Sequence, residues 1–126
     1  MIVHLGTDLV TVSDVAASIE TFGQRYLEFV YSAREVAFCM GVSGGPSVSR
    51  LAARFAAKEA VIKALRPPDG FALKEIEVSA DENGAPTMIY SGATAQWIES
   101  LRIASASVSL SHEKDFAIAV FVAFTV

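Results

Sequence analysis

The stretch RFAAKEAVIKAL, residues 54–65, decides the fold of this 126-residue chain. Alanine and large aliphatic side chains fill most of it, which predicts one long helix over Leu51–Leu65 that ends before Pro67 and Pro68. At about 100° per residue, its alanines share one side of the helix, where another element can approach the backbone closely. Bulky side chains cover a second side. The helix is therefore expected to be packed over most of its circumference.

Four charged side chains interrupt this apolar pattern. Glu59 and Lys63 share the narrow polar strip that remains, whereas Arg54 and Lys58 lie together near the aliphatic edge. The plainest interpretation of Glu59 and Lys63 is a solvated ion pair, which stabilises a helix by only a few tenths of a kcal/mol. A wet surface helix usually shows a broader polar face, however, and a half-buried carboxylate needs a cation or a metal ion beside it. The stretch alone leaves both interpretations open.

Helices and strands can be predicted on both sides of the central helix. The chain opens with a strand, continues through a helical region interrupted near Gly23, and closes with a strand pair. The expected elements are a strand in MIVHLGTDLV (1–10), helix in 14–38, a second helix in 32–40 with the capping box SARE, a loop at GVSGGPS (41–47), a hairpin of 71–80 and 87–92 around DENGAP (81–86), a helix in 93–101, and strands at 106–111 and 116–124. Separate helices and strand pairs favour an α+β fold, with a small antiparallel sheet packed with the long central helix and shorter helices. We expect a single domain over residues 1–126.

Composition excludes several classes of protein. The longest apolar run, 116–124, is far shorter than the about 20 residues that a membrane-spanning helix needs. The N-terminus has no secretory signal pattern, so we expect a soluble, cytoplasmic protein. The net charge of −4 and the lack of a basic cluster argue against nucleic acid as the main partner. One cysteine and two distant histidines give neither a disulfide nor a plausible zinc site.

Three further features have both a plain and a functional interpretation. Asp8 follows Gly6 at the end of the first strand, where it is either a turn residue or a metal ligand. Ser111, His112 and Asp115 could suggest a hydrolase triad, but the chain has no GxSxG elbow, and a phosphate donor is the better functional role for His112. The loop GVSGGPS lacks the Lys-Ser/Thr ending of a P-loop, so it is weak evidence for a nucleotide site.

Three stretches occur in an order and at distances that carry a resemblance. GTDLV (6–10), RFAAKEAVIKAL and VSLSHEKDFAIAV (108–120) together resemble the holo-acyl-carrier-protein synthase type of phosphopantetheinyl transferase. IEVSADENGAPTMIY (76–90) is similar to a strand–turn–strand pattern of the same family. The resemblance covers nearly the whole chain, and the central motif is its most specific part.

The resemblance implies an activity and its partners. Enzymes of that family transfer the phosphopantetheine arm of coenzyme A to a serine of an apo acyl carrier protein or carrier domain, a step that serves fatty acid biosynthesis and lipid metabolism. They need Mg²⁺, release adenosine bisphosphate, and typically form a homotrimer with the site in the cleft between neighbouring subunits. We therefore expect coenzyme A as co-substrate, Mg²⁺ as cofactor, a carrier protein as partner, and no membrane partner.

The resemblance also implies roles for individual residues. Asp8 and Glu59 would be the metal ligands, and Glu59 and Lys63 the catalytic pair, with Lys63 beside the phosphates as a candidate for proton transfer. The coenzyme A contacts would come from Arg54, Lys58, Lys63, Ser111 and His112, and the turn that flanks the adenine would supply Asn83, Gly84 and Pro86. Mg²⁺ commonly takes one or two carboxylates and completes its shell with substrate phosphates and water, so this residue set fits the chemistry.

The chain departs from the family pattern in the helix after the first strand. Asp14 stands where an arginine that docks an acidic carrier is common, and Thr11 replaces a frequent acidic residue. An acidic face repels a strongly acidic carrier. We hypothesise a carrier that belongs to a megasynthase or another specialised pathway, with Arg25, Arg34 and Arg50 as the remaining docking cations.

Two alternatives to an active transferase stay open at this point. One is a catalytically inactive carrier-docking or assembly domain of the same fold. The other is a different Mg²⁺-dependent phosphotransferase built from similar parts. The presence of all six charged or histidine positions of the pattern, namely Asp8, Arg54, Lys58, Glu59, Lys63 and His112, favours the active enzyme.

Overall fold

A computed structural model describes residues 1–41, 45 and 47–126. The elements are β1 (Ile2–Thr11), α1 (Val12–Phe22), α2 (Gln24–Val30), α3 (Ala33–Phe38), α4 (Val48–Leu65), a 3₁₀ turn η1 (Leu73–Glu75), β2 (Ile76–Ala80), β3 (Pro86–Tyr90), α5 (Gly92–Ser100), β4 (Ile103–Glu113) and β5 (Phe116–Thr125). The α+β class and the long central helix are confirmed. The predicted loop 41–47 lies largely outside the described residues. Within the described part of the chain, the structure contains no helix long and apolar enough to cross a membrane.

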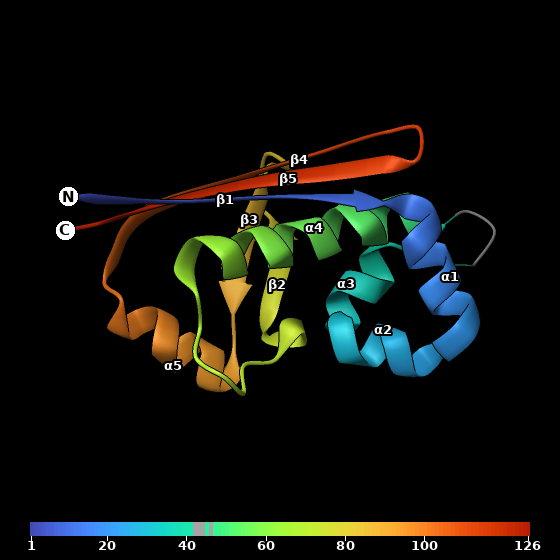
Figure 1. The fold of residues 1–126 in the computed structure, drawn as a ribbon, viewed down its shortest axis with the longest axis horizontal. Helices are drawn as coiled ribbons and strands as arrows, with labels where there is room; N and C mark the ends of the chain where they lie inside the picture. The colour runs from blue at the N-terminus through green and yellow to red at the C-terminus, as the bar shows by residue number, and fades with distance from the viewer. Residues whose placement is uncertain (42–44, 46) are drawn as a thin grey trace.

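The strands form two separate antiparallel sheets. The larger has the order β1-β5-β4, so the last strand of the chain is the central one, and Ile2 at the start of β1 pairs with Thr125 at the end of β5. The smaller is the hairpin of β2 and β3. Figure 1 shows the larger sheet as a layer along one side of α4, the hairpin crossing α4, α1–α3 near one end of α4 and α5 near the other.

The alanine side of α4 packs against the larger sheet, as its pattern predicts. The buried alanines of α4 belong to the same clusters as Ala117, Ala119 and Ala123 of β5. On β1 the approach is closer still, because a side chain at Gly6 would overlap with the backbone carbonyl of Ala60. Only glycine lets the two backbones approach this closely. This contact sets β1, and the residues that follow Gly6, directly beside α4.

Local sequence signals account for the ends of the helices. α3 begins with the predicted capping box, in which Ser32 and Glu35 each accept a hydrogen bond from the other residue's backbone N–H. α4 ends at Arg66, whose left-handed φ of 54° precedes the two prolines. α1 is capped from far along the chain, since the Asp115 carboxylate accepts hydrogen bonds from the backbone N–H and the hydroxyl of Ser13 at 2.9 and 2.7 Å. The β4–β5 turn is thereby fastened to the start of α1.

Candidate active site

Asp8 and Lys63 form an ion pair between β1 and α4. Alternation along β1 places Asp8 on the same face as Gly6, towards α4. Lys63 Nζ donates to Asp8 Oδ1 at 2.8 Å and to the backbone carbonyl of Thr7 at 3.1 Å, and the hydrogen bond to Asp8 raises the pKa of Lys63. The solvated Glu59–Lys63 pair considered from the sequence is therefore not formed. Lys63 bridges the two elements that Gly6 brings together.

Glu59 lies half-buried beside this pair. Burial, and next the negative charge of Asp8, raise the pKa of the Glu59 carboxyl, while Lys63 lowers it. Asp8 and Glu59 both line a cavity of about 540 Å³, which also contacts Leu9, Val10, Thr11, Asp14, Val15, Ser18, Tyr26 and Phe55. Two carboxylates so close together raise the free energy of the ionised state, and a cation that enters the cavity lowers it.

The donor set of this cavity fits a magnesium ion. Among the described residues no three His, Cys, Asp or Glu side chains cluster closely enough to hold a metal by themselves. Two carboxylates do suffice for Mg²⁺ when substrate phosphates and water complete its octahedron. Asp8 and Glu59 supply hard oxygen atoms from the cavity lining, and the exposed Lys63, ion-paired with Asp8, supplies a positive charge beside them. The arrangement suits a phosphate-bearing substrate.

Lys58 is the predicted site residue that the structure contradicts. Its side chain is completely buried, and Nζ donates to Glu35 Oε1 at 2.7 Å, to the carbonyl of Leu73 at 3.0 Å and to the carbonyl of Ile76. An ammonium group has three donors, and all three are used. The predicted contact between Lys58 and a phosphate is therefore wrong, and Lys58 holds the scaffold together.

Glu35 is the residue that sequence reasoning missed. The capping box located it at the start of α3, but nothing in the sequence signalled that its carboxylate is buried against Lys58. Its second oxygen accepts a hydrogen bond from the backbone N–H of Val78 at 2.9 Å. One carboxylate thus contacts α3, α4 and β2.

Arg54 is buried near Lys58 and keeps an unused donor. Its guanidinium stacks 4.5 Å from the centre of the Phe38 ring, and Nε has no hydrogen-bond partner among the described residues. Arg54 and Phe38 line a cavity of about 210 Å³ with Arg34, Glu77, Val78, Ser79 and Ala80. A buried guanidinium with an unsatisfied N–H is a favourable partner for an anion in that cavity.

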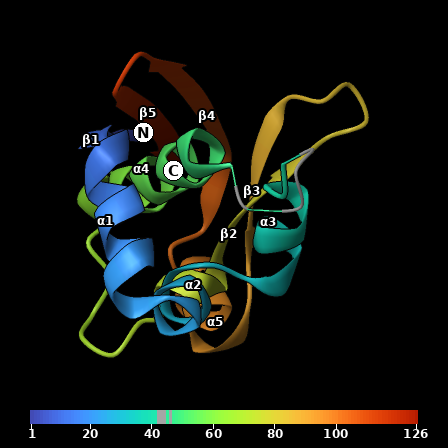
Figure 2. The same ribbon diagram turned by 90° about the vertical axis from the view of Figure 1, so that its right-hand side faces the viewer.

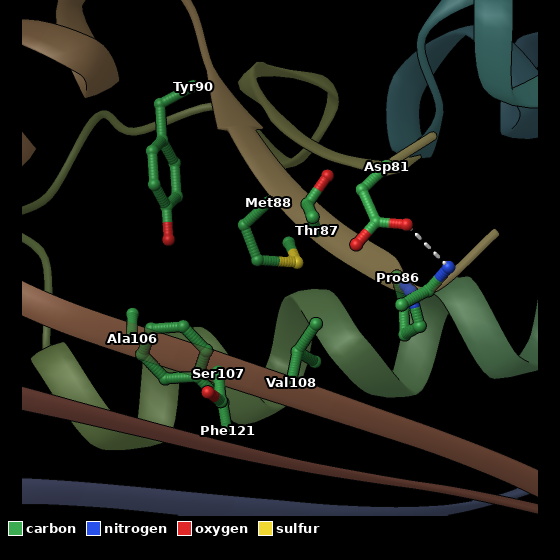
Figure 3. A pocket seen from close by; sticks show the side chains of 10 residues that line it. Asp81, Pro86, Thr87, Met88, Tyr90, Ala106, Ser107, Val108 and Phe121 are labelled. Carbon is green, nitrogen blue, oxygen red and sulfur yellow. Dashed lines mark hydrogen bonds between the residues drawn. The ribbon is translucent and has the colours of Figure 1, made fainter. Parts of the chain in front are cut away.

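The predicted turn at Asn83, Gly84 and Pro86 connects β2 to β3 at the surface. Asp81 orders it by accepting hydrogen bonds from the N–H groups of Asn83 and Ala85 at 2.8 and 2.9 Å. Figure 3 shows Pro86 at one end of a cavity of about 430 Å³ between β3 and β4. Burial raises the pKa of Tyr90, at the other end of that cavity, to about 12, so its phenol is neutral. The turn thus lies at one end of a hollow lined by both polar and apolar side chains.

Ser111 and His112 are both exposed near the end of β4. Successive strand residues point to opposite faces, so they cannot act as a pair on one face of the sheet. His112 is opposite Ala117, which packs with Leu51 in the core near the start of α4. Asp115 is occupied with Ser13, which removes the third member of the hydrolase triad considered above.

The predicted site residues therefore form two groups on different sides of α4. Figure 2 shows β1 and α1 on one side of α4, and α3 with the β2–β3 hairpin on the other. Asp8, Glu59 and Lys63 make up the first group, which we call the carboxylate cluster. Arg54 and the turn 83–86 belong to the second side, which we call the Arg54 side. The described chain does not bring the two together.

Comparison with known proteins agrees with this architecture. A sequence model described as the 4′-phosphopantetheinyl transferase superfamily matches residues 4–121. The chain therefore belongs to this class of transferases.

Individual relatives define the class further. The holo-[acyl-carrier-protein] synthase of Chloroflexus aurantiacus is 40% identical over 98% of both chains. The crystal structure of the synthase from Neisseria meningitidis superimposes with a TM-score of 0.85 and 31% identity over 97% of this chain and 98% of that one. The Helicobacter pylori synthase in complex with coenzyme A gives 0.80 and 30% over 95% and 99%. Within the superfamily, the chain belongs to the holo-[acyl-carrier-protein] synthase family.

Proposed function

We propose that this protein transfers the phosphopantetheine arm of coenzyme A to a serine of an apo acyl carrier protein or carrier domain, in a Mg²⁺-dependent reaction. The observation that carries the proposal is the half-buried pair of Asp8 and Glu59, with Lys63 beside it, around a cavity next to β1. Structural neighbours from Helicobacter pylori and from Chronobacterium ammoniagenes are described as complexes with coenzyme A, which supports the same co-substrate here.

The chemistry follows from the groups present. The serine oxygen of the carrier attacks the phosphorus next to pantetheine, the bond from that phosphorus to the bridging oxygen breaks, and adenosine 3′,5′-bisphosphate leaves. When bound, Mg²⁺ would neutralise charge on the diphosphate. Asp8 holds a proton on Lys63 Nζ, because their hydrogen bond raises the pKa of Lys63. Lys63 then acts as a cation beside the phosphates. Glu59, which lines the same cavity as Asp8, is proposed to accept the serine proton.

Arg54 and the turn 83–86 are proposed to bind the nucleotide end of coenzyme A. Arg54 offers an unsatisfied guanidinium N–H to a phosphate, and the turn offers exposed backbone and Pro86 to the adenine. We keep Ser111 and His112 as phosphate contacts, since both are exposed near the end of β4. Lys58 is not part of this set.

A homotrimer with its sites between subunits is the assembly we propose. The carboxylate cluster and the Arg54 side lie on different sides of one α4, so a neighbouring copy is needed to bring them together (Figure 2). The face of the larger sheet that points away from α4 is also apolar and exposed, with Leu5 at 65%, Leu9 at 63% and Phe116 at 49%. Such an exposed apolar face is typical of a protein interface. Light scattering on the wild type and on Leu5→Glu tests this: a trimer that falls to a monomer supports it, and a wild-type monomer contradicts it.

The charge of the cavity beside the carboxylate cluster affects which carrier can bind. Asp14 of α1 lines it together with Asp8 and Glu59, and none of its lining residues is a cation. We propose that this acidic wall disfavours strongly acidic carriers, and that the cognate carrier comes from a megasynthase or another specialised pathway. Asp14→Arg is expected to speed the modification of an acidic carrier; an unchanged rate would show that Asp14 does not discriminate.

The cytoplasm is the compartment we propose, because the single buried Cys39 requires no oxidising environment.

Intact-mass spectrometry tests the proposed activity directly. Several apo carriers are incubated with the protein, coenzyme A and Mg²⁺, beside Asp8→Ala, Glu59→Ala and the matched control Glu99→Gln, an exposed carboxylate on α5. Gain of one phosphopantetheine mass, which requires Mg²⁺ and both carboxylates but not Glu99, is the expected result. Neither transfer nor coenzyme A binding would point to the alternative, an inactive docking domain, whereas binding without transfer would point to a cognate carrier outside the tested set.

A further inference from the structure

The Glu35–Lys58 ion pair is fully buried, although burying an ion pair need not stabilise the fold. Both side chains have no exposed surface, and a buried ion pair is often no more stabilising than apolar residues of the same size. A buried pair that gives little net stability can instead fix one arrangement of the elements it joins. The question is therefore which arrangement this pair fixes.

The pair contacts every element that lines the cavity at Arg54. Glu35 lies on α3 between Arg34 and Phe38, which both line the cavity. Lys58 lies one turn after Arg54 on α4. On β2, the pair bonds the N–H of Val78 and the carbonyl of Ile76. The three elements around the cavity are thus joined at one point below it.

The same bonds fix the turn that follows β2. Val78 is two residues before Ala80, the end of β2, and Asn83 and Pro86 follow in the turn and in β3. Hydrogen bonds from the pair to β2 therefore set where the turn lies relative to Arg54 on α4. The β2–β3 hairpin belongs to a separate sheet and has no strand pairing with β1, β5 or β4 that could set this distance.

We infer that the Glu35–Lys58 ion pair is a positioning device for the nucleotide end of coenzyme A. It holds Arg54, which contacts a phosphate, at a fixed distance from the turn 83–86, which contacts the base. A ligand that spans both contacts binds well only when their separation is set in advance. The inference rests on the proposed function, and it gives Lys58 an indirect role in place of the direct phosphate contact that its sequence position suggested.

The test measures two quantities separately: the binding of a ligand that spans both contacts, and the rate of the chemistry at the carboxylate cluster. Adenosine 3′,5′-bisphosphate is the probe for binding, measured by calorimetry on the wild type, on Glu35→Gln, and on the double variant Glu35→Gln with Lys58→Met. The first variant keeps the shape of the side chain but cannot accept the Val78 N–H in the same way. The second leaves no unpaired buried charge, so it guards against a variant that simply unfolds. Steady-state kcat and KM for coenzyme A are measured in parallel.

A matched control separates positioning from general loosening. Glu75→Gln alters another partly buried carboxylate, which accepts hydrogen bonds from Thr94 at 2.8 and 3.3 Å, joins η1 to α5, and does not line the Arg54 cavity. We expect the Kd of the bisphosphate and the KM for coenzyme A to rise about ten- to a hundredfold in both pair variants, with kcat within about twofold of wild type and no such rise in Glu75→Gln.

Each other outcome overturns the inference. Unchanged Kd and KM in folded pair variants, an equal rise in Glu75→Gln, or loss of folding in both pair variants would leave the pair as an element of stability only. A wild type that transfers no phosphopantetheine and binds no bisphosphate would overturn the proposed function as well, so the two failures are distinguishable.

Discussion

Lys58 and Glu59 follow one another in α4 and face different surroundings, because successive helix residues point about 100° apart. Lys58 points between α3 and β2, where burial lowers its pKa and Glu35 opposes that shift. Glu59 points towards α1 and β1, where burial and Asp8 raise its pKa. The first residue has every donor satisfied. The second has a like charge for a neighbour.

The difference teaches how to separate scaffold from site in an apolar helix. A buried charge whose partners all lie within the chain is a structural residue. A half-buried charge without a full set of partners in the chain is a candidate ligand-binding residue. Charge and spacing alone do not distinguish the two, since both residues belong to one motif. The following predictions test the distinction.

The largest effect on activity is expected from substitutions in the carboxylate cluster. Glu59→Gln keeps the shape of the side chain but removes its charge and its ability to take up a proton, so turnover should fall by about 10²–10⁴-fold. Asp8→Asn should behave alike. Rates from carrier modification, compared with Glu99→Gln, give the measurement. A loss smaller than tenfold in Glu59→Gln would place the chemistry elsewhere.

The next effect is on stability, on the other side of the helix. Lys58→Ala leaves Glu35 as an unpaired buried charge and should lower the free energy of unfolding by about 3–5 kcal/mol. The paired replacement Lys58→Met with Glu35→Gln should cost less than Lys58→Ala, since no charge is left alone. Urea denaturation measures both. If the double variant were the less stable of the two, the pair would stabilise the fold by its own attraction.

The effect of Glu59 on the stability of the fold should depend on pH. The folded state raises the pKa of Glu59 above its ordinary value of 4.5, so ionised Glu59 destabilises the fold and this cost grows as pH rises through that range. Glu59→Gln should therefore melt at a higher temperature than wild type at pH 7, and the gap should close below pH 4.5. Thermal melts across this range, with Glu99→Gln as reference, measure it. A lower melting temperature at pH 7 would show that Glu59 is a structural residue.

The smallest effect is expected for an ion pair at the surface of the same region. Arg34 and Glu77 are 3.2 Å apart, but the Arg34 side chain is 77% exposed. Arg34→Ala should change the free energy of unfolding by about 1 kcal/mol or less, since water and salt screen such a pair. Denaturation at low and high salt tests this. A cost comparable with that of Lys58→Ala would mean that exposure does not separate the two pairs.

The sequence predicted the elements well because their signals are local. The alanine side of α4, the SARE cap and the strand alternation each depend on neighbours within a few residues, and all are found. The failures concern partners far along the chain. Lys63 pairs with Asp8, 55 residues away, and Lys58 pairs with Glu35, 23 residues away. Spacing could place these four side chains on elements, but only packing decides which of them meet.

The order of strands in the larger sheet has a consequence for the synthesis of the protein. β5 is the last strand to be made and the central one, so β1 and β4 have no partner until it is complete. Nearly the whole chain separates the residues that pair in β1 and β5, and pairings of this kind form slowly. Until then, the apolar residues of β1 and the alanine side of α4 stay uncovered, which is the state in which chains aggregate or recruit chaperones. A nascent chain that stops before β5 contains all the helix-forming segments α1–α5 and none of the strand pairings of the larger sheet.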